Sequence, residues 1–160
     1  MRVDDETSKE RHNRELIELL NELRVLLPGT QVIFAFLLAV PFSDRFKEIG
    51  TADRALYFIT LCSTAMSALL LIAPGAMHRL DFRLIDKGAM IKIATRLAIW
   101  GTVFVAVSMV GALTFVALLI YGETAAIVVG VVAAVLFTGG WFVMPLRWRR
   151  KHPEEPRHDT

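Results

Sequence analysis

The side chains that could support chemistry inside the apolar part of this sequence are mostly hydroxyls. Thr60, Ser63, Thr64 and Ser67 recur at i, i+3, i+4 and i+7 spacing, so they share one narrow face of a helix. Small residues let helices approach closely, and hydroxyls can bond across the contact, which favours a helix-packing face. A surface lined by water or by a transported substrate is the alternative interpretation.

The other residue types that do chemistry are scattered along the chain. The four histidines, His12, His78, His152 and His158, lie in three separate segments, whereas metal sites need clustered ligands. The single cysteine, Cys62, lies inside an apolar block and cannot form an intramolecular disulfide. The sequence contains no nucleophile elbow, phosphate loop or zinc-protease helix. We therefore expect no catalytic, cofactor-binding or metal site, no cofactor and no enzymatic activity.

The elements that carry these residues are four long apolar blocks. The chain is 54% hydrophobic with a mean hydropathy of +0.49. A helix needs about 20 apolar residues to cross a bilayer. Four uncharged blocks approach or exceed this length: Val25–Phe42, Ala55–Met77, Leu97–Tyr121 and Ala125–Leu146. The sequence predicts an all-α polytopic membrane protein whose residues 25–146 form a four-transmembrane-helix bundle, with the first span as an uncleaved targeting signal.

Basic residues predict the orientation of these spans. The N-terminal segment, the loop between the second and third spans, and the C-terminal tail carry five Lys and Arg residues each. The first loop carries three and the third loop none, so alternate segments divide fifteen against three. The positive-inside rule then places both termini in the cytoplasm. Trp and Tyr prefer the membrane interfaces, and Tyr57, Trp100, Tyr121 and Trp148 lie near predicted span ends.

Residues 1–24 predict a cytoplasmic amphipathic helix. Its leucines between Leu16 and Leu27 fall on one face at 100° per residue, with polar residues opposite. This face either packs on the chain's own bundle or interface, or pairs with a second copy or another protein. Pro28–Gly29 is expected to break or kink the helix before the first span. The tail, residues 147–160, is charged and contains two prolines, which predicts disorder.

The loop His78–Arg96 is basic. Arg79, Arg83 and Lys87 recur every four residues and would share a face if the segment were helical. We expect them to contact headgroups of the anionic inner leaflet, and a specific lipid or protein site is the alternative. No nucleic-acid partner is expected.

Several short strings lie along the chain: Glu15–Leu16, Glu22–Leu23–Arg24, Phe34–Ala35–Phe36–Leu37, Pro41–Phe42, Arg45–Phe46, Ala73–Pro74, His78–Arg79 and Phe82–Arg83. Together they resemble an uncharacterised family of small bacterial four-span membrane proteins, many of them actinobacterial. The resemblance covers most of the chain from Glu6 to about Arg150 and is strongest through Arg83. Some members carry an automatic sodium:proton antiporter label. The family has no established catalytic or binding residues, so the resemblance implies none here.

Two functions agree with these patterns. The first is a non-catalytic interaction or accessory subunit of the cell membrane, acting through helix contacts. The second is a small homo-oligomeric transporter or channel whose pathway the hydroxyls of the second span would line. Sodium:proton exchange is disfavoured, because the four predicted spans contain no ionisable group that could bind either a cation or a proton at depth.

Overall fold

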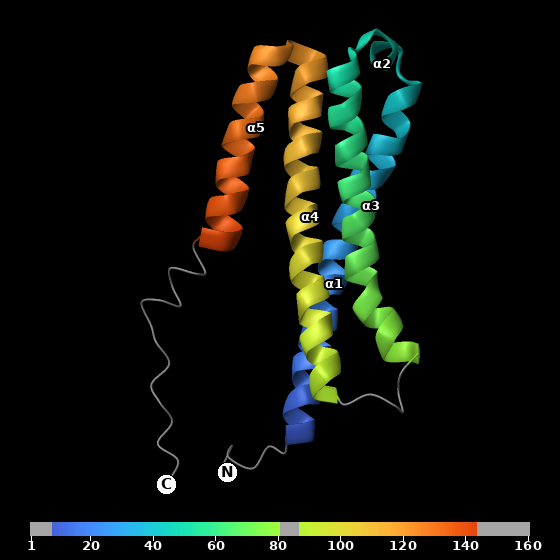
Figure 1. Ribbon diagram of the computed structural model, residues 1–160, viewed down its shortest axis with the longest axis vertical. Coiled ribbons are helices and arrows are strands. Elements are labelled where there is room, and N and C mark those ends of the chain that lie inside the picture. Colours follow the sequence, from blue (N-terminus) through green and yellow to red (C-terminus); the bar gives the residue numbers. More distant parts are fainter. Residues whose placement is uncertain (1–7, 81–86, 144–160) are drawn as a thin grey trace. The chain divides into compact units, whose positions relative to one another are not determined.

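The computed structural model describes residues 8–80 and 87–143, and these residues are almost entirely helical (Figure 1). The elements in chain order are α1 (Ser8–Ala39), the 3₁₀ turn η1 (Val40–Phe42), α2 (Asp44–Glu48), α3 (Thr51–Leu80), α4 (Lys87–Tyr121), α5 (Glu123–Thr138) and the π-helical turn η2 (Gly139–Val143). No strand occurs in this described part of the chain.

Four helical segments are long and apolar enough to cross a membrane. They are Ile17–Phe42, Thr51–Met77, Met90–Tyr121 and Glu123–Trp141. The prediction of an all-α chain with four transmembrane helices is therefore confirmed, and the protein is a multi-pass membrane protein. All four segments begin earlier than the sequence predicted, because each helix continues beyond its uncharged block into residues with charged side chains.

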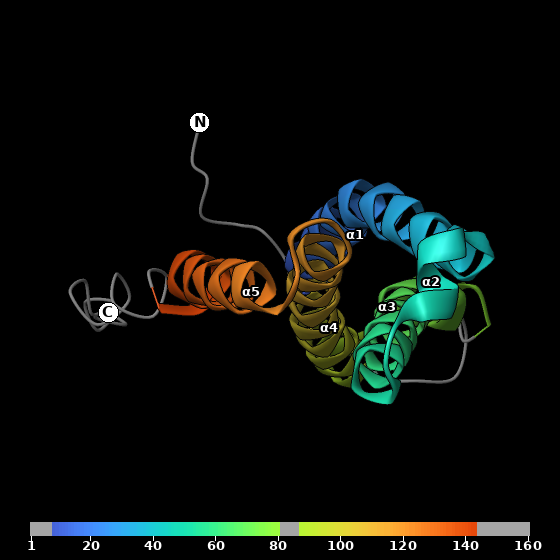
Figure 2. The same ribbon diagram turned by 90° about the horizontal axis from the view of Figure 1, so that it is seen from above.

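The chain divides into two compact units whose boundary lies inside α4. Unit 1 ends at Ala112 and contains α1, α2, α3 and most of α4. Viewed along the helices, α1, α3 and α4 of this unit lie side by side, and α2 lies at the ends of α1 and α3 (Figure 2). Unit 2 begins at Leu113 and contains the end of α4, α5 and η2. The hydroxyl face belongs to unit 1.

Pro28 was expected to break or kink the helix, and the break does not occur, because α1 runs through this proline as one helix of 32 residues. Proline lacks an N–H and therefore leaves the Arg24 carbonyl, four residues earlier, without its helical donor. In hydrocarbon, ending the helix at Pro28 would leave several backbone N–H and C=O groups without hydrogen-bond partners, because no water is present. Continuing the helix through the proline therefore costs less free energy. The amphipathic segment and the first span are consequently one element, and residues 17–24 extend the span.

The turn after α1 is held by a hydrogen bond from α3. Pro41 has no N–H to donate to the Leu37 carbonyl, four residues before it. The Tyr57 hydroxyl donates to this carbonyl instead, at 3.0 Å, in a buried position. The Tyr57 ring also packs edge-on against Phe46 of α2, with 4.9 Å between ring centroids. Tyr57 therefore connects α1, α2 and α3, and its position at the membrane interface stays a prediction.

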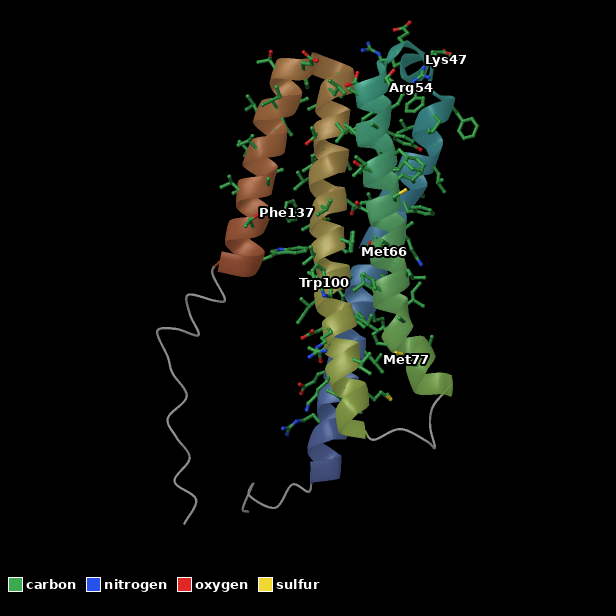
Figure 3. All side chains as sticks on the ribbon, in the orientation of Figure 1. Lys47, Arg54, Met66, Met77, Trp100 and Phe137 are labelled. Carbon is green, nitrogen blue, oxygen red and sulfur yellow. The ribbon has the colours of Figure 1, made fainter. Side chains whose placement is uncertain are left out.

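The loop predicted at His78–Arg96 is largely helical. α3 continues to Leu80 and α4 begins at Lys87, so Lys92 and Arg96 lie within α4. Figure 3 places Lys47 and Arg54 at the α2 end of unit 1 and Met77 towards the other end of α3. The long basic loop of the sequence analysis is thus replaced by helix ends joined through residues 81–86.

Unit 2 is an antiparallel hairpin with a one-residue turn. Gly122 alone separates α4 from α5, and its φ of 88° lies in the left-handed region that favours glycine. The third and fourth apolar helices therefore follow one another with a single connecting residue.

Candidate functional site: the small-residue contact of α3 and α4

All four residues of the hydroxyl face are buried within unit 1. Thr60 is 2% exposed, Ser63 7%, and Thr64 and Ser67 0%. Three of these side chains bond to carbonyls of their own helix: Thr60 Oγ1 donates to Leu56 at 2.8 Å, Thr64 Oγ1 to Thr60 at 2.8 Å, and Ser67 Oγ to Thr64 at 2.7 Å. Their hydroxyl protons are therefore donated to the α3 backbone.

Glycines of α4 lie against this face. A Cβ built on Gly111 would stand 2.3 Å from Thr60 Oγ1 and 3.1 Å from Thr60 Cβ. A Cβ built on Gly101 would meet Leu71 at 2.6 Å. Such distances leave no room for a side chain, so α3 and α4 approach closely at both positions. We call this contact the α3–α4 seam; it comprises Thr60, Thr64, Ser67 and Leu71 of α3, and Gly101, Ser108 and Gly111 of α4.

The seam follows a heptad-like pattern on both helices. Buried residues of α3 recur with alternating spacings of three and four, at Tyr57, Thr60, Thr64, Ser67, Leu71 and Pro74. The buried residues Ala94, Ala98, Gly101, Val105 and Ser108 do the same on α4. This spacing is typical of helices that cross at a small angle with side chains of one fitted between those of the other. Ser108, fully buried, donates to the Val105 carbonyl at 2.9 Å.

The α1 leucines complete the interior of unit 1. Leu23 forms a buried cluster with Leu71 of α3 and with Ala98 and Val105 of α4. Three further leucines of α1 pack against this cluster: Leu19, Leu26 and Leu27. Much of the Leu16–Leu27 face that was predicted to bind either the chain's own bundle or a partner is therefore in contact with the chain itself.

The predicted headgroup residues lie at or beyond the described ends of α3 and α4. Arg79 lies in the last turn of α3, and Lys87 is the first residue of α4. Arg83 lies outside the described residues, as do the side chains of Arg79 and Lys87. That these three residues share a face and contact lipid headgroups therefore stays a prediction.

A second close contact occurs within unit 2. A Cβ built on Gly130 of α5 would stand 2.7 Å from Thr114 Oγ1 of α4. Ala126 and Ala133, on the same side of α5, are the buried residues of that helix. Gly130 thus lies against α4 on the side of α5 that carries its buried alanines, whereas Ala134 is exposed.

The part of the chain that the structure describes contains no group of three or more potential metal ligands among His, Cys, Asp and Glu. All four histidine side chains lie outside it, and Cys62 is exposed on α3. Within the same residues every buried side-chain nitrogen or oxygen has a hydrogen-bond partner. The arrangement can therefore fix the positions of the helices.

Sequence reasoning missed the Tyr57–Leu37 hydrogen bond and the roles of Gly101 and Gly111. The absent N–H of Pro41 was a signal for the first, because it predicts an unpaired carbonyl at Leu37 that some donor must satisfy. The glycines gave only a weak signal, since glycine is frequent in transmembrane helices for several reasons.

Comparison with known families gives one match, to a family of unknown function designated DUF6328, over residues 5–145. The chain belongs to this family. The match covers every helix that the structure describes, from α1 to η2, in agreement with the resemblance to an uncharacterised family. No curated protein and no solved structure matches the chain.

Proposed function

We propose that this protein is a non-catalytic subunit of the bacterial cell membrane that acts through contacts with itself or with other membrane proteins. The observation that carries the proposal is the state of the hydroxyl face. Thr60, Thr64 and Ser67 are buried and donate to carbonyls of their own helix, so they are used for packing. Meanwhile large apolar side chains of α5, such as Val131, Val135 and Leu136, are exposed and available to lipid or protein.

We further propose that both termini are cytoplasmic, from the fifteen-to-three division of basic residues. In a Cys62→Ala background, Ser8→Cys and Gly88→Cys should be shielded from an impermeant thiol reagent in intact cells. Thr51→Cys and Glu123→Cys should be labelled, because each begins a helix at the opposite end. Labelling of Gly88→Cys in intact cells, without labelling of Thr51→Cys, would reverse the orientation.

A homo-oligomeric transporter is the second candidate, and one observation favours it. The argument against ion exchange assumed a first span that began at Val25, whereas the apolar segment of α1 begins at Ile17. It therefore includes Glu18, Glu22 and Arg24, all exposed. Ionisable groups inside a span are costly and are commonly kept for function. These three residues lie in the first eight positions of the segment, where long side chains can reach the interface.

Ion flux separates the two candidates. We expect proteoliposomes that contain only this protein to show no sodium-driven proton flux above empty vesicles, measured with an internal pH-sensitive dye. The physical reason is that no carboxylate lies in the central part of a spanning segment. A sodium-driven proton flux would contradict the accessory role. It would establish the transporter if one of three substitutions abolished it: Glu22→Gln, Asp44→Asn or Asp53→Asn. Thr51→Ala is the control, because it changes a residue near α2 without removing a charge and should leave any flux unaltered.

A further inference from the structure

A groove runs between α1 and α3 in unit 1, on the side of α1 next to its packed leucine face. Its volume is about 610 Å³, within the range of roughly 300–1,000 Å³ that is typical of ligand clefts. Its lining comes equally from the two helices: Leu20, Leu23, Arg24 and Leu27 of α1, and Leu71, Ile72, Gly75 and Ala76 of α3. All of these residues belong to unit 1.

Small residues of α3 open this groove. A Cβ built on Gly75 would meet no atom within 4 Å, and Ala76 beside it is exposed. Leu23 and Leu71, both buried, form its floor, so the space between the helices is walled by hydrocarbon side chains. An apolar groove on the outside of a membrane-spanning helix pair lies where acyl chains are the surrounding solvent.

Arg24 is the one charged residue in the groove lining. It lies seven residues after Ile17, the start of the apolar segment, and its side chain is exposed. Within the described part of the chain no ion pair is recorded for Arg24, whereas Arg14 of the same helix lies 4.0 Å from Glu18. The nearby acids, Glu18 and Glu22, occupy other faces of α1, since they stand six and two residues from Arg24 at 100° per residue.

An unpaired guanidinium beside an apolar groove is complementary to one kind of molecule in a membrane. An acidic phospholipid offers a phosphate that the planar guanidinium can bond through two N–H groups, and acyl chains that can lie against leucine and glycine. A charge so placed in an apolar segment is expensive unless it meets an anion or reaches the headgroup region. We propose that the groove between α1 and α3 binds one acidic phospholipid, with its phosphate on Arg24 and an acyl chain over Gly75 and Ala76.

Native mass spectrometry of the purified full chain tests this proposal. The protein is released from detergent after equilibration with equal amounts of phosphatidylglycerol and phosphatidylcholine of the same acyl chains, and the bound ratio is counted. Wild type should retain phosphatidylglycerol in preference. Arg24→Gln should lower the ratio by about five-fold, the usual effect of one basic residue on an acidic lipid. Arg24→Lys should keep part of the preference, since it keeps the charge but not the bidentate geometry.

Two further variants separate this groove from general surface charge. Lys92→Gln removes an exposed basic residue of α4 that does not line the groove and should leave the ratio unchanged. Gly75→Leu, whose side chain has room to enter the groove, should reduce retention of both lipids. Equal ratios for wild type and Arg24→Gln, or an equal loss in Lys92→Gln, would overturn the proposal. So would displacement of the lipid by millimolar inorganic phosphate, or a second polypeptide seated in the groove in place of lipid.

Discussion

Replacing Gly111 by valine should destabilise the protein by about 3 kcal/mol or prevent its recovery as a single species, since overpacking a tight interior costs about 1–3 kcal/mol or more. The added Cβ would lie 3.1 Å from Thr60 Cβ, an atom that no rotamer change of Thr60 can move away. The helices of the α3–α4 seam would therefore have to separate. The measurement is the midpoint of unfolding of the purified protein in a fixed detergent.

The matched control is Gly29→Ala, because a Cβ there meets no atom within 4 Å. It should be neutral or stabilise α1 by up to about 1 kcal/mol, as alanine does relative to glycine in helices. Ser67→Leu should resemble Gly111→Val, since Ser67 is fully buried, whereas Leu69→Ala should have little effect because Leu69 is 64% exposed. If Gly111→Val unfolds at the same midpoint as Gly29→Ala, the seam is not a close contact.

Replacing Tyr57 by phenylalanine should cost about 1–3 kcal/mol, the usual penalty for leaving a buried polar group without a partner. The ring contact with Phe46 is kept, so the change isolates the hydrogen bond to the Leu37 carbonyl. Tyr121→Phe is the control, since Tyr121 is 77% exposed. Its midpoint of unfolding should match that of wild type within error.

A second substitution identifies the cause of this effect. Pro41→Ala restores a backbone N–H that can bond to Leu37, four residues earlier. In that background Tyr57→Phe should cost less than half of what it costs in wild type. The double-mutant cycle measures this coupling directly. Equal costs in the two backgrounds would mean that the Tyr57 hydroxyl does not act by replacing the N–H that Pro41 lacks.

The hydropathy and the length of the apolar blocks were sufficient to predict the all-α class and the four apolar helices. A bilayer requires spanning segments to be helical and sets their minimum length. The sequence predicted helix ends and individual side-chain contacts less well, because local rules ignore the tertiary contacts around each residue. Pro28 predicts a helix end in water, but within an apolar segment α1 continues through it. Tyrosine is a residue type that prefers membrane interfaces. That the Tyr57 hydroxyl reaches the Leu37 carbonyl becomes clear only when α3 is seen to pack beside α1.

The hydroxyl face was visible in the sequence, but the residues opposite it were not. Its spacing predicts that Thr60 and Ser67 share one side of α3. It says nothing of the register between α3 and α4, which pairs Thr60 with Gly111 and Leu71 with Gly101. Register depends on the fit of many side chains at once, so it follows from packing rather than from the period of either helix.

The central claim is that the hydroxyl face packs against α4 and does not line an aqueous path, and cysteine accessibility tests it most directly. In a Cys62→Ala background, Ser67→Cys in reconstituted membranes should remain unmodified by a small water-soluble thiol reagent until the protein is denatured, because Ser67 is fully buried. Thr51→Cys, exposed at the start of α3, should react at once as the positive control. Rapid modification of Ser67→Cys in the folded protein would contradict the claim and indicate a water-filled pathway along α3.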